Sequence, residues 1–151
     1  MLSHISKSGK AVMVNIESKT FSLRKATAQS IIKVPSKIYD TIIYDINSNV
    51  LSTSRLAGIC ASKKTSELIP LCHQINLDSV KIDITSDKIN EFIIKSQVIA
   101  NYKTGVEMEA LTAVTVASLT FYDMCKAISH DIIIDDIKLI KKSGGKSDIN
   151  I

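Results

Sequence analysis

The chain has 151 residues, of which 45% are hydrophobic and 23% are charged, and this composition is usual for one globular domain with its own core. Its formal net charge of +4 suits a small anionic ligand and is too low to predict a nucleic-acid-binding protein. We expect no membrane span and no signal peptide, because the chain lacks an apolar stretch of either kind.

The first half of the chain predicts one strand and two helices. Residues 1–10 are polar and predict a flexible tail, whereas residues 11–151 predict a single domain. Alternating residues predict a strand at 26–34, and a proline followed by a serine N-cap predicts a helix at 36–46. A second helix is predicted at 52–68. Its apolar stripe would consist of Leu56, Ile59, Cys60 and Lys63.

The second half predicts a hairpin, a long helix and a last strand. The hairpin strands lie at 80–84 and 92–100, with a turn at 86–88. The long helix occupies most of 103–126 after a break at its Lys-Thr-Gly start, and the last strand lies at 132–140. The chain then ends in a basic, glycine-containing tail.

This order of elements is the split βαβ pattern with one additional helix. It predicts an α+β, ferredoxin-like fold in which a four-stranded antiparallel sheet has its helices packed on one face. The other face of the sheet would be covered by another element or solvated.

The long helix carries no charge from Ala110 to Tyr122. A helix with almost no polar face is normally covered on more than one side, here by the sheet and by a second element such as another copy of the chain. Its main apolar stripe would consist of Val106, Ala110, Ala113, Ala117, Phe121 and Met124.

Charged residues lie at the two ends of this helix. Glu109 and Asp123 are 14 residues apart, so a straight helix separates them by about 21 Å. If both serve one small site, a second subunit must supply one of the two ends. The alternative is that these charges only cap and solubilise a core helix.

Several residues have a chemical and a structural interpretation. His73 suits proton transfer or a structural hydrogen bond, and no CxxC or HxxxH pair accompanies it to predict a zinc site. Cys72 is a nucleophile or a buried structural thiol. Asp123 and Lys126 can pair one helical turn apart, as an acid–base couple or as a weak surface salt bridge. Lys63 is a lysine with a buried stem or a cation for an anionic ligand.

The cysteines and the tail exclude two further classes. Cys60, Cys72 and Cys125 are odd in number and have no CxxC spacing, which favours reduced thiols and a cytoplasmic protein. The tail sequence KSGGKS is no P-loop, because Ile140 occupies the position of the required first glycine and no helix can follow. It is either a flexible basic arm that closes over an anion or a solvated terminus.

Four strings now coincide in order and spacing: SRLAGICASKKT, LIPLCH, KTGVEMEALTAVTVASLTFYDMCKA and KSGGKS. Together they resemble the molybdenum-cofactor biosynthesis protein C family, the cyclic pyranopterin monophosphate synthases, over nearly the whole chain from Met13 to the tail. The resemblance implies a ferredoxin-like fold and a lyase that rearranges the cyclised GTP intermediate to cyclic pyranopterin monophosphate and releases pyrophosphate.

The resemblance also implies partners and cofactors. We expect a homohexamer, a trimer of dimers with its active sites at the dimer interfaces, which acts on a GTP-derived small molecule and not on nucleic acid or membranes. No cofactor and no protein-bound metal are expected, and Mg²⁺ would enter only with the triphosphate.

Site residues follow from the matching strings. Asp123 corresponds to the family's active-site aspartate, Lys126 to its partner lysine, and His73 to the catalytic or substrate-binding histidine. The substrate-contacting segments comprise Leu71, Cys72, Met108 and Glu109, with Glu107 beside them. The basic positions suited to the triphosphate are Arg24, Lys63, Lys103, Lys142 and Lys146.

The chain departs from the family pattern at three positions. Asn47 replaces a lysine implicated in catalysis, Asn15 replaces an aspartate, and Gln74 replaces a proline. The alternative reading is therefore a catalytically weakened family member that binds the nucleotide. An RNA-binding ferredoxin-like module is disfavoured, because Phe92 is the one aromatic residue that the hairpin strands offer for base stacking.

Overall fold

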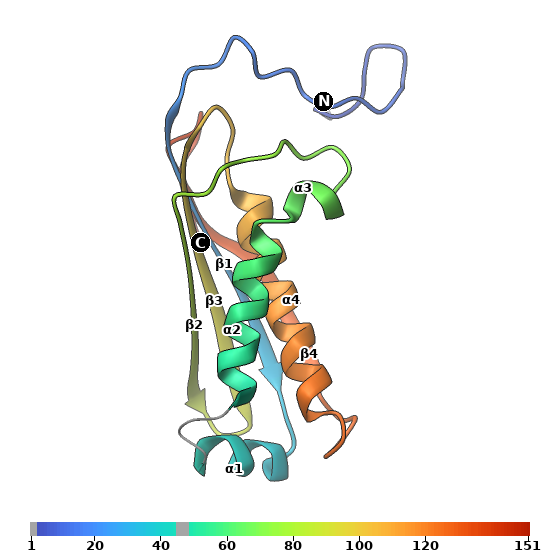
Figure 1. Ribbon diagram of the computed structural model, residues 1–151, viewed down its shortest axis with the longest axis vertical. Helices are drawn as coiled ribbons and strands as arrows, with labels where there is room; N and C mark the ends of the chain where they lie inside the picture. The colour runs from blue at the N-terminus through green and yellow to red at the C-terminus, as the bar shows by residue number, and fades with distance from the viewer. Residues whose placement is uncertain (1–2, 45–48) are drawn as a thin grey trace.

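The computed structural model describes residues 3–44 and 49–151, and Figure 1 shows how their helices and strands are arranged. The strands in these ranges are β1 (Ser22–Lys33), β2 (Ser79–Lys88), β3 (Glu91–Tyr102), β4 (Ile133–Ser143) and β5 (Ile149–Asn150). The helices are α1 (Ser36–Tyr44), α2 (Asn49–Ser62), α3 (Thr65–Leu68) and α4 (Glu107–Cys125). The predicted end of the first helix, at Ile46, lies outside the described residues.

The strands form one antiparallel sheet in the order β2-β3-β1-β4-β5. The helices α2 and α4 lie together on one face of this sheet, as Figure 1 shows. The α+β class and the antiparallel sheet are thus confirmed. The prediction of four strands missed β5, a two-residue strand formed when the tail folds back and pairs with Lys141 and Lys142.

The core lies between the sheet and α4. Alternate residues of β1 and β3 point into it, as period-two alternation requires. Phe92 of β3 and Phe121 of α4 are both buried, with ring centroids 5.2 Å apart. Two buried hydroxyls, on Ser30 and Ser118, bond to each other and so avoid the cost of an unpaired polar group.

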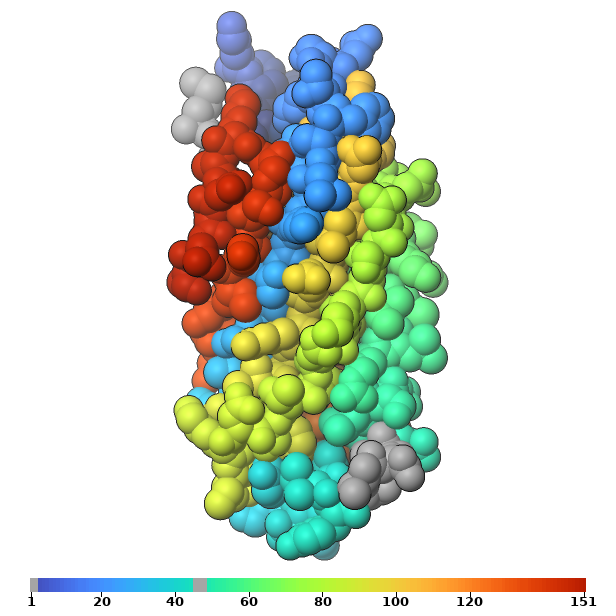
Figure 2. Space-filling model, turned by 90° about the vertical axis from the view of Figure 1, so that its left-hand side faces the viewer, coloured from blue at the N-terminus to red at the C-terminus, as the bar shows by residue number. Residues whose placement is uncertain are grey.

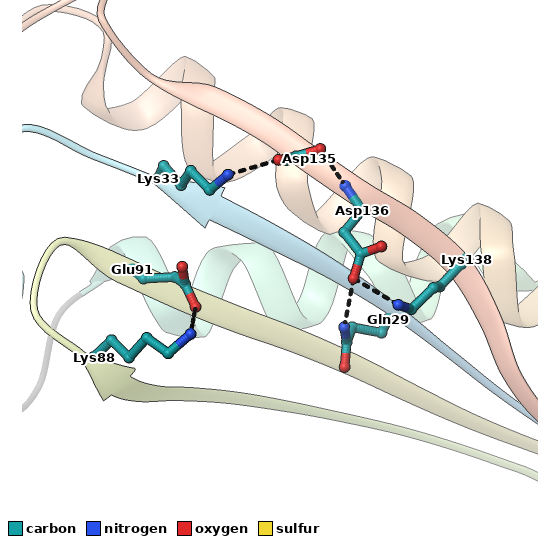
Figure 3. Close-up of polar contacts among 7 residues, drawn as sticks. All are labelled: Gln29, Lys33, Lys88, Glu91, Asp135, Asp136 and Lys138. Atoms are coloured by element: carbon teal, nitrogen blue, oxygen red, sulfur yellow. Dashed lines mark hydrogen bonds and ion pairs between the residues drawn. The ribbon is translucent and has the colours of Figure 1, made fainter. Parts of the chain in front are cut away.

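The opposite face of the sheet has no helix over it among the described residues, and it carries charged and polar side chains beside isoleucines such as Ile133. Figure 2 shows the strands crossing that face without a helix over them. Figure 3 shows its ion pairs: the ammonium of Lys33 lies 2.7 Å from Asp135, and that of Lys138 lies 2.9 Å from Asp136. Gln29 also donates a hydrogen bond of 3.0 Å to Asp136.

Helix α4 confirms most of its predicted stripe. Val106, which precedes the helix, is buried, as are Ala110, Ala113, Ala117 and Phe121 within it. Met124 was predicted to be buried and is 37% exposed, because it lies near the C-terminal end of α4 where Cys125 turns toward the core instead. The hydroxyls of Thr115 and Thr120 in α4 donate to carbonyls one turn earlier, so these polar groups are satisfied within a helix that has few charges.

The predicted second helix is two helices, with a turn at residues 63–64 between α2 and α3. Its predicted stripe is confirmed only at Ile59, which packs against the core, and is wrong at Leu56, which is 61% exposed, and at the exposed Cys60. The buried residues of α2 are instead Ser54, Gly58, Ala61 and Ser62. The reason is close packing against α4: a Cβ on Gly58 would lie 2.7 Å from the carbonyl oxygen of Ala113.

The β2–β3 turn lies later than predicted. Strand β2 continues through the expected turn at 86–88, with a shift in its pairing between Thr85 and Lys88. The turn falls at residues 89–90, where Asn90 adopts a φ of 63°. Asparagine tolerates this left-handed conformation better than most residues, so it decides where the chain reverses.

None of the helices formed by the described residues combines the length and apolar character that a membrane crossing requires.

Candidate active site

Two pockets adjoin each other where β3 ends and α4 begins. The first has a volume of about 620 Å³ and the second about 400 Å³. Both are lined by the segment between β3 and α4, and both include Lys19 and Glu107 in their walls. A single ligand longer than either pocket would therefore pass over this shared rim.

We call the first the basic pocket. Its wall contains six basic side chains and one carboxylate, that of Glu107, with polar or glycine residues between them. A pocket with this excess of positive charge is suited to a polyanion. The six are Lys19, Arg24, Lys25, Lys103, Lys142 and Lys146.

The register of the sheet explains why these cations meet. Strand β1 pairs with β3 and β4, so that Lys25 lies opposite Ser143 and Ala26 opposite Lys142. Beyond β4 the chain turns at Gly144, whose φ is +84° and whose Cβ, if it had one, would overlap the carbonyl oxygen of Leu23. This position requires glycine, and the turn brings the tail with Lys146 onto the pocket.

The two best-held cations have neutral partners. The guanidinium of Arg24 donates to the carbonyls of Tyr102 and Lys103, at 3.3 and 3.5 Å. The ammonium of Lys103 donates to the carbonyl of Glu17 at 2.9 Å and lies 5.5 Å from the ring centroid of Phe21. These contacts fix the positions of the cations and leave their charge available to an anion.

We call the second the histidine pocket. It is lined by the turn after α3, by the first turn of α4 and by the N-terminal segment. Its residues are Ser3, His4, Val14, Lys19, Leu71, Cys72, His73, Ile75, Thr104, Gly105, Glu107, Met108 and Glu109. The predicted substrate-contacting residues of 71–73 and 107–109 therefore share one pocket in the structure.

Glu109 is the most perturbed acid of this pocket. Glu109 is only 4% exposed. Burial raises the pKa of its carboxyl to about 7, with a smaller contribution from the charge of Glu107. A hydrogen bond from its own backbone N–H acts in the opposite direction. Near neutral pH this carboxyl is present in both protonation states, which is the property that a general acid or base needs.

Cys72 differs from an activated nucleophile. Burial and the nearby carboxylate of Glu109 both raise the pKa of its thiol. A thiolate is the reactive form of cysteine. This argues against the nucleophile interpretation, while the structural alternative fits only in part, because Cys72 is half-buried and lines the pocket.

Asp123 and Lys126 form the predicted pair at the other end of α4, with an N–O distance of 2.6 Å. Both side chains are exposed, and the hydrogen bond and charge of Asp123 raise the pKa of Lys126. The length of helix from Glu109 to Asp123 is about 21 Å, so one chain does not bring this pair to the histidine pocket.

Lys63 is also apart from the other predicted cations. It lines a third pocket of about 500 Å³ together with Gln74 and residues 75–80. In one chain it is therefore not part of the basic pocket.

Three pocket residues with titratable side chains were missed by the sequence interpretation: His4, Lys19 and Lys25. Lys25 alternates with core residues of β1 and is the one that an inspection of strand polarity could have found. Lys19 and His4 belong to segments without regular structure, where sequence periodicity gives no information.

No group of three or more His, Cys, Asp or Glu side chains in ranges 3–44 and 49–151 is arranged to hold a metal ion. Cys60, Cys72 and Cys125 are free thiols.

Comparison with known proteins gives the family. The model of the MoaC family matches residues 13–145, a range that contains most of both pockets. The chain belongs to the MoaC family. The resemblance inferred from the four sequence strings is thereby confirmed.

Individual MoaC relatives agree over most of the chain. A cyclic pyranopterin monophosphate synthase of Syntrophomonas wolfei is 48% identical over 149 residues, which cover 95% of this chain and 94% of the relative. Cyclic pyranopterin monophosphate synthase 3 of Mycobacterium tuberculosis is 42% identical, over 97% of this chain and 84% of the relative. Molybdenum cofactor biosynthesis protein 1 of Drosophila melanogaster is 46% identical over 97% of this chain, which spans only 26% of that longer protein.

Three positions, Asn47, Asn15 and Gln74, depart from the family pattern. Asn47 lies outside the described residues. The Asn15 side-chain oxygen accepts a hydrogen bond of 2.8 Å from the Glu17 N–H, a role that an aspartate would fill equally. Gln74 is exposed in the third pocket.

Proposed function

We propose that this MoaC protein is a cyclic pyranopterin monophosphate synthase, a lyase of molybdenum cofactor biosynthesis. It would rearrange the cyclised GTP intermediate to cyclic pyranopterin monophosphate and release pyrophosphate. The observation that carries the proposal is the pair of adjoining pockets, one rich in cations and one with titratable groups, in a chain whose family contains the named synthases.

The triphosphate would occupy the basic pocket. Closure of the cyclic phosphate expels pyrophosphate, and negative charge develops on the leaving group. Arg24, Lys103, Lys142 and Lys146, together with Lys19 and Lys25, would stabilise that charge. The contacts that hold Arg24 and Lys103 in place would reduce reorganisation during the reaction. Mg²⁺, if it takes part, would arrive with the triphosphate, and the proposal includes no resident cofactor.

The base-derived part of the substrate would occupy the histidine pocket. Opening and reclosing its rings needs groups that give and accept protons, and His73 and Glu109 are of that kind. Leu71, Cys72 and Met108 would contact the ring system. Glu107, on the shared rim, would face the sugar between the two ends of the ligand.

Asp123 and Lys126 would act across a subunit boundary. Their separation from the histidine pocket along α4 supports a site completed by a second copy of the chain, within a homohexamer built as a trimer of dimers. Lys63 would join the triphosphate contacts only in such an assembly. No nucleic acid or membrane partner is part of the proposal.

Three further assignments, of fold type, domain bounds and location, complete the proposal. The strand order β2-β3-β1-β4 supports a ferredoxin-like classification, with β5 as an addition. The domain would comprise residues 11–151 after a flexible tail at 1–10. Free thiols support a cytoplasmic location.

A product assay tests the function. Purified protein supplied with the cyclised GTP intermediate should yield the cyclic pterin and one pyrophosphate for each turnover. Absence of both products with folded protein would favour the weakened alternative. Asn47→Lys would then be expected to restore turnover, because it introduces the lysine that the family pattern has at this position.

A further inference from the structure

The N-terminal residues form a small hairpin beside the histidine pocket. The N–H of Val12 donates to the carbonyl of His4 at 2.9 Å, and the N–H of Ser6 donates to the carbonyl of Lys10 at 2.8 Å. Ile5 and Ala11 form a bridge between the two arms. Residues 3–12, which we call the N-terminal hairpin, thus have hydrogen bonds of their own and lie outside the range matched by the family model.

The hairpin reaches the site with its first arm. Ser3 and His4 line the histidine pocket together with Cys72, His73 and Glu109. Its apolar residues Ile5 and Val12 are 44% and 43% exposed, so only part of their surface is available to anchor the hairpin by burial. Figure 1 shows the hairpin at the same end of the molecule as α3, beyond the ends of the long strands.

The His4 ring has a defined orientation. Its Nδ1 lies 3.3 Å from the carbonyl oxygen of Val12. A carbonyl only accepts, so Nδ1 carries the proton in this bond, and Nε2 of the neutral ring is an acceptor. The hairpin therefore places a ring with an acceptor nitrogen in the lining of the pocket that also contains His73 and Glu109.

We propose that His4 is a substrate-contacting residue and that the N-terminal hairpin closes over the histidine pocket when a purine-derived ring occupies it. This inference rests on the proposed function for the identity of the ligand. Amino and ring N–H groups of a guanine-derived ring are donors that match the free acceptor of His4. Closure would exclude water from the groups that transfer protons.

The weak attachment of the hairpin fits this role. A segment held by its own few hydrogen bonds can move as a unit at small cost, and a ligand that bonds to it shifts its position by that contact. One hydrogen bond from His4 to a neutral donor corresponds to about a tenfold effect on binding or rate.

Steady-state kinetics with the full chain give the first test. His4→Ala should lower kcat/KM by about tenfold, mainly through KM, because a ground-state contact is lost. His4→Gln keeps an acceptor of similar reach and should retain most of the wild-type value. Lys7→Ala, at an exposed position on the same hairpin, is the matched control and should equal wild type. Equal values for His4→Ala and Lys7→Ala would overturn the proposal, as would equal losses for His4→Ala and His4→Gln.

A binding experiment separates this inference from the proposed function. The chain has three histidines, so protein labelled at histidine Cε1 gives three NMR signals that single His→Gln substitutions assign. GTP, which has both a base and a triphosphate, should shift the signals of His4 and His73. Pyrophosphate, which fits the basic pocket alone, should leave the His4 signal in place.

The outcomes are distinct. A His4 signal that stays unmoved by saturating GTP overturns the inference, and so does a shift by pyrophosphate as large as that by GTP. If GTP shifts both signals while the wild-type protein makes no product, the hairpin inference stands and the proposed synthase activity fails.

Discussion

The carboxylate of Glu107 lies 3.2 Å from the ammonium of Lys142, on the rim that the basic pocket shares with the histidine pocket. Both side chains are about three-quarters buried, so the pair is shielded from salt more than a surface pair would be. In the free protein Glu107 therefore neutralises a cation that the proposed substrate would need. An incoming triphosphate has to compete with this carboxylate for Lys142.

Removing that competition should strengthen anion binding. Glu107→Gln is expected to raise the affinity for pyrophosphate by about threefold, the scale of one partly exposed ion pair, measured by titration calorimetry. The same variant should lose turnover, since Glu107 is proposed to face the substrate. Glu67→Gln, an exposed acid on α3 outside both pockets, is the control. Weaker pyrophosphate binding by Glu107→Gln would show that the carboxylate organises the basic pocket and does not block it.

The cations of the basic pocket should act together on a polyanion. Lys25→Ala and Lys146→Ala are each expected to weaken pyrophosphate binding by about fivefold, with a smaller loss at high salt because the charges are partly screened. Lys81→Ala provides the control, as this lysine pairs with Asp83 on β2 away from the pocket. Calorimetry at two salt concentrations measures both effects. Equal affinities for Lys25→Ala and Lys81→Ala would remove Lys25 from the proposed site.

The buried carboxyl of Glu109 should make stability depend on pH. Its pKa is about 7 in the folded protein against an ordinary 4.5. Between these values the unfolded chain releases the proton and the folded chain keeps it, so stability falls as pH rises through this window and then levels off. The loss amounts to about 3 kcal/mol at most.

Urea unfolding at fixed protein concentration checks this dependence. Glu109→Gln, which cannot ionise, should gain stability relative to wild type when the pH is raised from about 4 to about 8. Glu67→Gln should follow wild type. A wild-type curve parallel to that of Glu109→Gln would mean that the carboxyl titrates normally.

The tail turn should be intolerant of any side chain at Gly144. Alanine there must adopt a positive φ and overlap the carbonyl of Leu23. Gly9 is a matched control, because its φ is +78° but a Cβ would meet no atom within 4 Å. Gly9→Ala should cost about 1 kcal/mol, the cost of the left-handed conformation alone.

Gly144→Ala should cost more and should also weaken pyrophosphate binding, since the turn carries Lys146 to the basic pocket. Thermal unfolding and calorimetry measure the two effects. Normal pyrophosphate affinity in Gly144→Ala would show that the tail is not part of the anion site.

Mixed assemblies test the shared active site. His73→Ala and Asp123→Asn should each be inactive alone. In an equal refolded mixture about half of the dimers contain one copy of each variant, and one of the two sites in such a dimer combines two intact ends. The mixture should therefore regain about a quarter of wild-type activity. A mixture of His73→Ala with Glu109→Gln should regain none, since both residues come from the same pocket. No recovery in the first mixture would place Asp123 outside the shared site.

The sequence alone determined the family and the approximate positions of most helices and strands. Alternation of apolar residues located β1 and β3, because a strand exposes successive side chains to opposite faces. The uncharged run of α4 showed a helix covered on more than one side. Short strings such as GVEMEALTA identify the family directly, because they are recognised from the order of residues alone and do not depend on which residues are neighbours in space.

The tertiary structure decided which residues share a pocket. Lys19 and Arg24, Lys103, and Lys142 belong to three segments that are far apart in the chain, and the strand order β3-β1-β4 brings these segments together. It also decided that small residues such as Gly58, and not Leu56, are the buried face of α2, since the distance to α4 is fixed by packing. Local periodicity contains no information about that distance, or about the hairpin that brings His4 into the same pocket as His73.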